Sequence, residues 1–244
     1  MSDLALFALA GFVAQMIDGV LGMGYGVSAT SLLLSFGVPA AVSSASVHTA
    51  EIAGTGFAAW SHYRYGNVVW SIAKRLLIPG VIGAVIGAYV LTSIPGDRIR
   101  PFIAVYLLLM GVVILVKAFR RAAPKTAGDG PLTPLGLVGG FFDAIGGGGW
   151  GPIVVGTLLA RGGEPRKTIG SANFAEFFVT VAAAATFLVT LGLTDWKPVV
   201  GLAIGGAIAA PISARIVNRV PAKPLMISVG VLVILLSLRT IFKS

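Results

Sequence analysis

Four acidic residues stand inside otherwise apolar sequence, and they form two matching pairs. Asp18 and Glu51 recur as Asp143 and Glu176 with the same offset of 125 residues. Ionisable groups in such surroundings are costly to bury and usually functional, and a carboxyl group can take up and release a proton. We therefore expect these four residues to be proton-coupling residues. A helix-capping role is an equally good explanation of the two aspartates.

Each aspartate directly precedes a glycine-rich stretch, DGVLGMGYG (Asp18–Gly26) or DAIGGGGWG (Asp143–Gly151). Glycine at this density destabilises a helix by about 1 kcal/mol per residue, so the helix should break there. A broken helix directs free backbone N–H groups at the break, and glycine lets a small anion approach them closely. The candidate substrate-binding residues of the two stretches are Gly22, Gly24, Gly26, Gly147, Gly148, Gly149 and Trp150. Alternatively, the glycines only permit close helix packing, as the GxxxG spacings Gly83–Gly87 and Gly201–Gly205 should do.

Two polar segments follow the glycine stretches, SVHTAE (Ser46–Glu51) and SANFAE (Ser171–Glu176). Positions three apart share a helix face, so each segment places a hydrogen-bonding side chain, His48 or Asn173, beside its glutamate. The candidate substrate-binding residues of these segments are Ser46, His48, Thr49, Ser171 and Asn173. A single histidine here could also be a hydrogen-bonding core residue. No second His or Cys is in reach, so we expect no metal site.

The composition is that of a membrane protein. Of the 244 residues 56% are hydrophobic and 11% are charged, whereas soluble domains carry about 25% charged residues. The apolar runs have the length of about 17–25 residues that a membrane-spanning helix needs. The sequence therefore predicts an all-α polytopic protein of the bacterial cytoplasmic (inner) membrane.

The net charge of +9 does not indicate nucleic-acid binding, because the Lys and Arg residues lie in short segments beside apolar spans. Such residues normally face lipid headgroups, so membrane lipids are the expected partners. The absence of Cys excludes disulfides and thiolate metal sites. No P-loop motif is present, and we expect no cofactor.

The chain contains an internal duplication. Residues 11–57 aligned on 136–182 give 13 identities in 47 positions. We expect a first transmembrane repeat (1–119), a polar linker (120–134) and a second repeat (135–244). Each repeat begins with a glycine-interrupted segment, 4–36 or 135–160. The expected ordinary spans are 41–61, 76–93, 101–118, 169–192, 198–214 and 224–241.

The orientation of the two halves depends on the glycine-interrupted segments. If each is one kinked crossing, the chain has eight spans and the halves are parallel. If each is a re-entrant hairpin or two short crossings, the halves are inverted. Lys and Arg then divide thirteen to five between the two sides, against ten to eight for parallel halves. The positive-inside rule therefore favours inverted repeats with both termini outside the cytoplasm.

These motifs resemble the TauE/SafE family of sulfite exporters, also called the toluene-sulfonate uptake permease family. The resemblance rests on the glycine run of Gly140–Gly149 with Gly170–Asn173, and on Phe12–Gly26 with Ser43–Glu51. It covers nearly the whole chain, although the first glycine run, GMGYG, is degenerate. The resemblance implies transport of small sulfur anions such as sulfite, thiosulfate or organosulfonates, coupled to the proton gradient.

Three functions remain after this comparison: a secondary anion transporter, which we favour as an exporter, a passive anion channel, and an intramembrane serine protease. The paired carboxyl groups favour the transporter over the channel. A protease needs an activated serine, and no GxSxG motif is present. We therefore expect no enzymatic activity. The sequence leaves open the anion, the direction, the proton stoichiometry and whether the protein is a homodimer.

Overall fold

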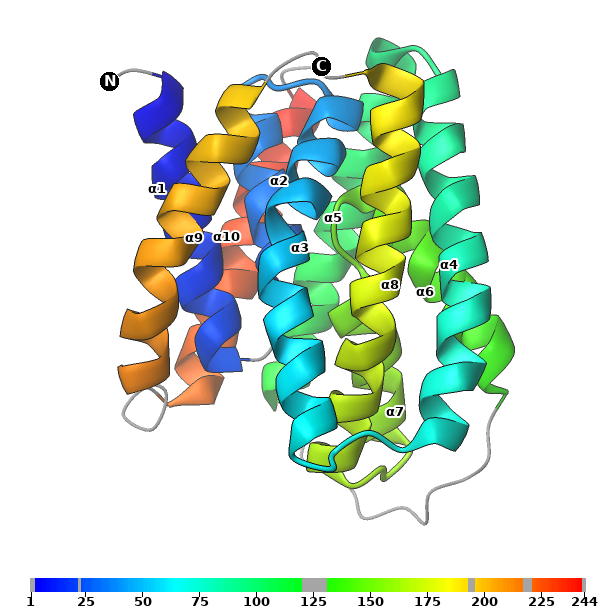
Figure 1. Ribbon diagram of the computed structural model, residues 1–244. Helices are drawn as coiled ribbons and strands as arrows, with labels where there is room; N and C mark the ends of the chain where they lie inside the picture. Colours follow the sequence, from blue (N-terminus) through cyan, green and yellow to red (C-terminus); the bar gives the residue numbers. More distant parts are fainter. Residues whose placement is uncertain (1–2, 22, 120–130, 193–195, 217–220, 243–244) are drawn as a thin grey trace.

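The computed structural model is a bundle of helices (Figure 1) and describes residues 3–21, 23–119, 131–192, 196–216 and 221–242. Its helices are α1 (Asp3–Leu21), α2 (Tyr25–Ser35), α3 (Ala40–Arg64), α4 (Trp70–Ser93), α5 (Gly96–Phe119), α6 (Leu132–Gly146), the π-helix η1 (Gly151–Val155), α7 (Gly156–Ala160), α8 (Pro165–Leu191), α9 (Trp196–Ile216) and α10 (Ala222–Phe242). Within the described residues five helices, α4, α5, α8, α9 and α10, are long and apolar enough to span a membrane. The predicted all-α polytopic fold is confirmed.

The six ordinary spans each correspond to one long helix, from α3 to α5 and from α8 to α10. Proline marks several of their ends. Pro165 begins α8, where its missing N–H is tolerated. Pro95 follows the end of α4 and holds Ile94 in an extended conformation. The predicted linker (120–134) lies largely outside the described residues, and its last three residues belong to α6.

Both glycine stretches interrupt their helices, as predicted. The first break separates α1 from α2 and contains Gly24 with φ 106°. The second separates α6 from η1 and contains Gly147 with φ 65°. Both φ values lie in the left-handed region, which favours glycine. Gly22 lies outside the described residues.

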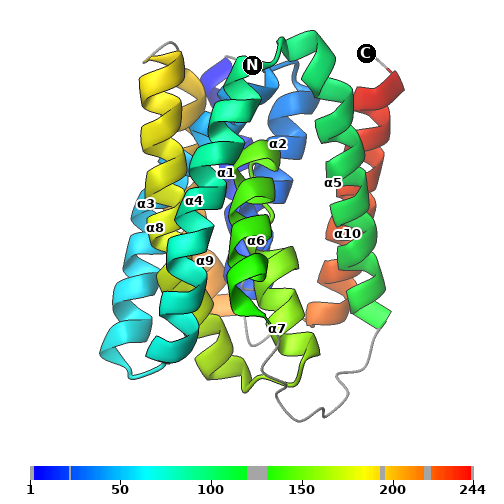
Figure 2. The same cartoon turned by 90° about the vertical axis from the view of Figure 1, so that its right-hand side faces the viewer.

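The two arms of each broken segment run in opposite directions and form a hairpin (Figures 1 and 2). In Figure 1, α1 descends from the upper edge and α2 returns to it, whereas α6 rises from the lower edge and α7 returns there. The long helix after each hairpin also differs in direction, since α3 descends and α8 rises. Helix α1 begins and α10 ends at the same edge of the bundle.

The two halves are interleaved. Helix α1 packs along α9 of the other half, and α6 packs along α4. The predicted GxxxG packing lies at these two contacts. A side chain at Gly83 or Gly87 would overlap the backbone of α6, and one at Gly205 would overlap the backbone of α1. The helices therefore approach backbone to backbone, as small residues allow in membranes.

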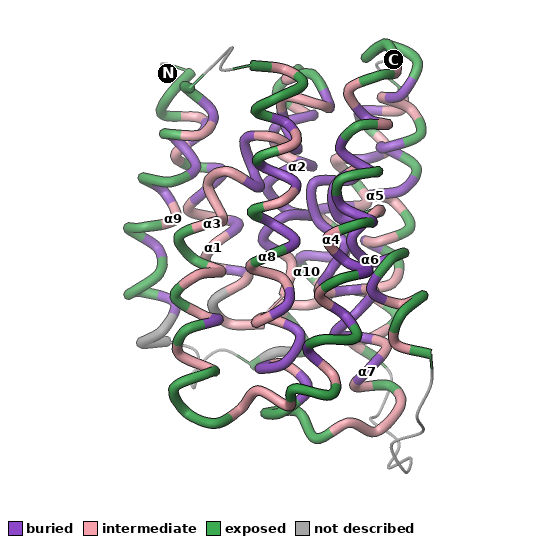
Figure 3. The backbone as a smooth tube through the Cα atoms, turned by 45° about the vertical axis from the view of Figure 1, so that its right-hand side comes forward, coloured by how far each residue is buried: buried purple, intermediate pink, exposed green. Residues whose placement is uncertain are grey.

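Buried residues gather in the interior of the bundle, around the hairpin arms α2 and α6, and exposed residues lie along the outer helices (Figure 3). Large apolar side chains such as Phe57, Ile78 and Val189 are exposed on the outer faces. Outward-facing apolar side chains are expected for a protein surrounded by lipid. The arrangement thus places both glycine breaks at its centre.

Candidate functional site

The two glycine breaks touch each other at the centre of the bundle. A side chain at Gly26 would overlap the carbonyl group of Gly147 and the Cα of Gly148. A side chain at Gly148 would in turn overlap the backbone of Gly26 and Val27. The Thr30 hydroxyl links the hairpins further by donating to the Gly147 carbonyl oxygen at 3.1 Å. The close approach therefore requires glycine at this crossing point.

The two aspartates hold the second arm of each hairpin. The backbone N–H groups of Gly149 and Trp150 donate to Oδ1 of Asp143 at 2.7 and 2.9 Å. At the equivalent place in the first half, the Asp18 carboxyl group lies near the backbone N–H of Tyr25. The two contacts of Asp143 satisfy N–H groups that a helix start leaves without partners. This is the capping geometry that the sequence offered as an alternative role for the aspartates.

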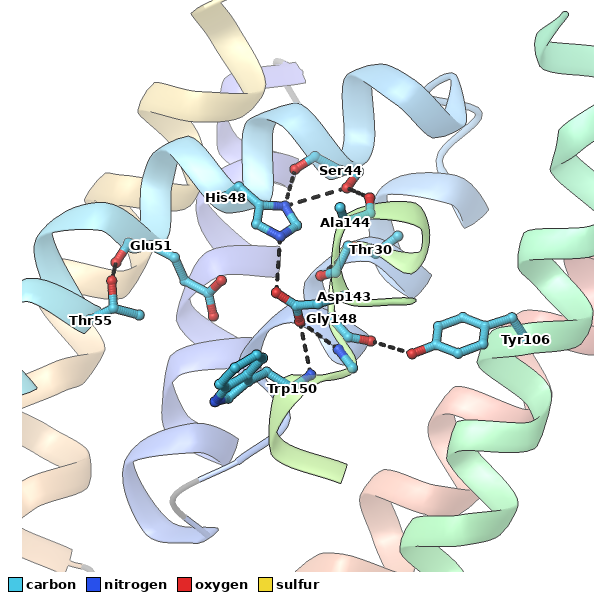
Figure 4. Close-up of polar contacts among 12 residues, drawn as sticks. Thr30, Ser44, His48, Glu51, Thr55, Tyr106, Asp143, Ala144, Gly148 and Trp150 are labelled. Carbon is cyan, nitrogen blue, oxygen red and sulfur yellow. Dashed lines mark hydrogen bonds and ion pairs between the residues drawn. The ribbon is translucent and has the colours of Figure 1, made fainter. Parts of the chain in front are cut away.

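His48 completes the surroundings of Asp143 (Figure 4). Its Nδ1 lies 2.8 Å from the Ser44 carbonyl oxygen, and its Nε2 lies 3.2 Å from Oδ2 of Asp143. A carbonyl oxygen only accepts, so Nδ1 carries a hydrogen. A second proton must then lie between Nε2 and Oδ2, on one atom or the other. Either way the buried pair has no net charge.

A cavity of about 100 Å³ lies in front of the crossing point, and both halves line it. Its ionisable residues are Asp18, Glu51, Asp143 and Glu176. Its other polar side chains are Tyr25, Thr55 and Asn173, and no Lys or Arg is among its described lining residues. The carboxyl groups of Glu51 and Glu176 make no hydrogen bond to any residue that the structure describes. The two glutamates therefore differ from Asp143, which is held by backbone N–H groups.

A second cavity, of about 300 Å³, lies between α3, α8 and α9. It is lined mainly by apolar side chains and contains no ionisable group among its described residues. Phe187 stands in its wall with its ring centroid 6.0 Å from that of His48. The second cavity is larger, but its described lining contains no ionisable group that could exchange a proton. The smaller, acid-lined cavity is therefore the candidate site.

The structure brings most of the predicted site residues to the acid-lined cavity and places the others elsewhere. Those at the cavity are the four acids, Gly24, Gly26, Gly148, Gly149 and Asn173. Ser46 and Thr49 line the apolar cavity instead. The Ser171 hydroxyl accepts from the backbone N–H of Val69 at 2.8 Å, and the fully buried Trp150 donates from Nε1 to the Ala172 carbonyl oxygen at 3.1 Å.

Sequence reasoning missed several residues that support the site. Ser44 orients His48 and donates to the Ala144 carbonyl oxygen. The Tyr106 hydroxyl donates to the Gly148 carbonyl oxygen at 3.1 Å. Thr55 lines the cavity, and it recurs in the second repeat as Thr180. This recurrence could have marked Thr55 as a site residue. Tyr106 lies far along the sequence from its partner, and no local pattern marks it.

The fold is that of a multi-pass membrane protein, and its acid-lined cavity lies where the two halves meet. The sequence model of the family described as sulfite exporter TauE/SafE matches residues 7–240. The chain belongs to this family.

The relatives of the chain carry consistent names. The protein called "Probable membrane transporter protein YtnM" from Bacillus subtilis (strain 168) is 44% identical over 99% of this chain and 83% of its own length. The "Probable membrane transporter protein ORF9" of a Sinorhizobium species is 25% identical over 93% of this chain and 89% of its own length. No solved structure matches the chain significantly.

Proposed function

We propose that this protein is a proton-coupled secondary transporter that exports small sulfur-containing anions, such as sulfite or organosulfonates, across the cytoplasmic membrane. The observation that carries the proposal is the cavity where the two hairpins meet, lined by glycine backbone and by the carboxyl groups of both halves. The substrate class comes from membership of a family described as sulfite exporters.

The anion would be held by uncharged donors. Gly26 and Val27 line the cavity in the first turn of α2, where backbone N–H groups have no partner within the helix. The Asn173 side chain adds an amide donor that makes no hydrogen bond to the described residues. The N–H groups of Gly149 and Trp150 are already bound by Asp143. The first hairpin therefore supplies the backbone donors.

The proton would be carried by Glu51 and Glu176. An anion beside ionised carboxylates in a site shielded from water is strongly repelled, so anion entry favours their protonated forms. These two glutamates have no competing hydrogen bonds to the described residues. Anion and proton then occupy the cavity together, and the direction of transport follows the sum of their two gradients. Export results when the anion accumulates in the cell.

We also propose that the halves are inverted repeats with both termini outside the cytoplasm. The opposite directions of α3 and α8 in Figure 1 support this arrangement. The excess of Lys and Arg on one side supports the orientation. Inverted repeats with a site at their interface are a common plan of secondary transporters.

The test is sulfite flux into proteoliposomes with and without an imposed pH gradient. Protein-free liposomes measure the background flux, which is the sulfur dioxide that crosses the bilayer without the protein. We expect the native protein to move sulfite faster from the acidic side, and Glu51→Gln or Glu176→Gln to abolish this dependence on the gradient. Asp143→Asn serves as the matched acid-to-amide control and should keep it, because the aspartate is held by its capping contacts.

Two outcomes would contradict the proposal. Flux that ignores the gradient in the native protein and survives both glutamate substitutions would indicate a passive anion channel. If the native protein moves neither sulfite nor thiosulfate nor an organosulfonate, the proposed substrate class is wrong.

A further inference from the structure

A lysine from the end of a membrane span reaches the wall of the acid-lined cavity. Lys117 lies in the last turn of α5, and its ammonium group donates to the Pro152 carbonyl oxygen at 2.7 Å. Pro152 belongs to η1 and lines the cavity together with the four carboxyl groups. The ammonium group is therefore in contact with the cavity wall.

The second hairpin is shaped around this ammonium group. A side chain at Gly156 would overlap Nζ of Lys117, so glycine at this position leaves room for the charge. The preceding η1 is a π-helix, a rare geometry that is frequent at functional sites. Lys117 forms no ion pair with a carboxylate of the described residues. Its charge is thus partly buried and held by a carbonyl oxygen alone.

An unpaired ammonium group is costly within a membrane span and usually serves a function. The cavity has four acidic side chains and no basic one among its described lining residues, so a nearby cation changes which ligands can enter. We infer that Lys117 is a specificity-determining residue, whose positive charge beside the second hairpin favours an anionic substrate in an acid-lined cavity. This inference rests on the proposed anion transport.

The position opposite Lys117 in the other half can be found by aligning the prolines of the two last spans. The proline that begins the last span of each half is Pro101 or Pro224, and this register places Thr240 opposite Lys117. The Lys117 charge stands beside the second hairpin, the one with the uninterrupted glycine run. The two halves are then unequal in their electrostatic contribution.

The experiment measures the concentration dependence of sulfite and thiosulfate uptake by proteoliposomes containing Lys117→Gln or Lys117→Arg. Gln keeps a hydrogen-bond donor for Pro152 but removes the charge. We expect Lys117→Gln to raise KM for both anions about tenfold, because one unit charge is lost near a partly shielded site. The value of kcat should change less than about twofold. Arg keeps the charge and should restore most of the affinity. The matched control is Lys74→Gln, which removes an exposed lysine of α4 and should leave KM unchanged.

A third variant separates charge from folding. The chain contains no cysteine, so Lys117→Cys introduces a single thiol. One portion of this variant is alkylated at the thiol with 2-bromoethylamine, which rebuilds a lysine-like cation. A second portion of the same preparation is alkylated with iodoacetamide, which adds a neutral group. Lower KM with the cationic adduct alone supports the inference. Equal KM values for the two adducts, or an unchanged KM in Lys117→Gln, overturn it while anion transport by the native protein still stands. A native protein that moves no anion would contradict the proposed function itself.

Discussion

The carboxyl groups of the cavity differ in their contacts, and the proposed proton coupling by the two glutamates rests on this difference. Asp143 accepts two backbone N–H groups and shares a proton with His48. Glu51 and Glu176 face the cavity without such contacts to the described residues. A carboxyl group with several fixed partners is suited to positioning, whereas one without them can exchange a proton at little structural cost.

The contacts of Asp143 lead to a prediction about two substitutions. In Asp143→Asn, the amide oxygen can accept both N–H groups and the amide nitrogen can donate to Nε2 of a neutral His48. We expect a melting temperature within about 2 °C of the native value. Asp143→Ala leaves these buried groups unpaired, which costs about 2–4 kcal/mol, or roughly 5–10 °C in a chain of this size.

Tryptophan fluorescence of the purified protein in detergent during heating would measure both values. Equal destabilisation by Asn and Ala would show that the carboxylate charge, rather than the hydrogen-bond geometry, holds the second hairpin.

At the scale of elements, the two hairpins depend on glycine where their backbones cross. Gly26 and Gly148 each occupy space in which an added methyl group would overlap the other hairpin. Not every glycine at the cavity is constrained in this way. Gly54 also lines the cavity, but it lies on α3 with no atom within 4 Å of its missing side chain.

These surroundings predict opposite effects of alanine. Gly26→Ala and Gly148→Ala should each destabilise the protein by about 3 kcal/mol or more, because the overlapping atoms are backbone and cannot rotate away. Gly54→Ala should be neutral or stabilise α3 by up to about 1 kcal/mol. Melting temperatures and the yield of monodisperse protein would measure the three effects. A tolerated alanine at Gly148 would mean that the hairpins can separate without loss of stability.

The elements could be predicted well from sequence and the site only in part. Helix bounds and glycine breaks are local properties, set by apolar length, proline and glycine, and they were found. The contact between His48 and Asp143 joins residues 95 positions apart. Lys117 lies at the end of the expected span 101–118, and its contact with the second hairpin was not expected. Such pairings depend on how helices from different halves pack, which a single sequence does not encode in any local pattern.

At the scale of the whole molecule, the helices of the two halves are exchanged rather than stacked. Each hairpin lies against the other half, with α1 on α9 and α6 on α4. The proposed inversion of the halves would place equivalent loops on opposite sides of the membrane. Pro39 and Glu164 are equivalent, exposed residues just before α3 and α8.

The absence of native cysteine allows a direct test of this topology. Pro39→Cys should react with a membrane-impermeant thiol reagent in intact spheroplasts, and Glu164→Cys should react only in inside-out vesicles. The denatured protein serves as the control for full labelling. Labelling of both cysteines from the same side would show that the halves are parallel.

The exchange of hairpins between halves has a consequence for biosynthesis. Helix α1 is made first, but α9, against which it packs, is almost the last helix to leave the ribosome. Until then α1 must remain in the lipid without its partner, and its sequence between Leu4 and Leu21 contains Asp18 as its single charged residue. Helix α6, by contrast, is synthesised after α4, so its partner is already in the membrane when α6 enters it. The second hairpin can therefore dock as it is synthesised, whereas the first becomes fixed only when the chain is nearly complete.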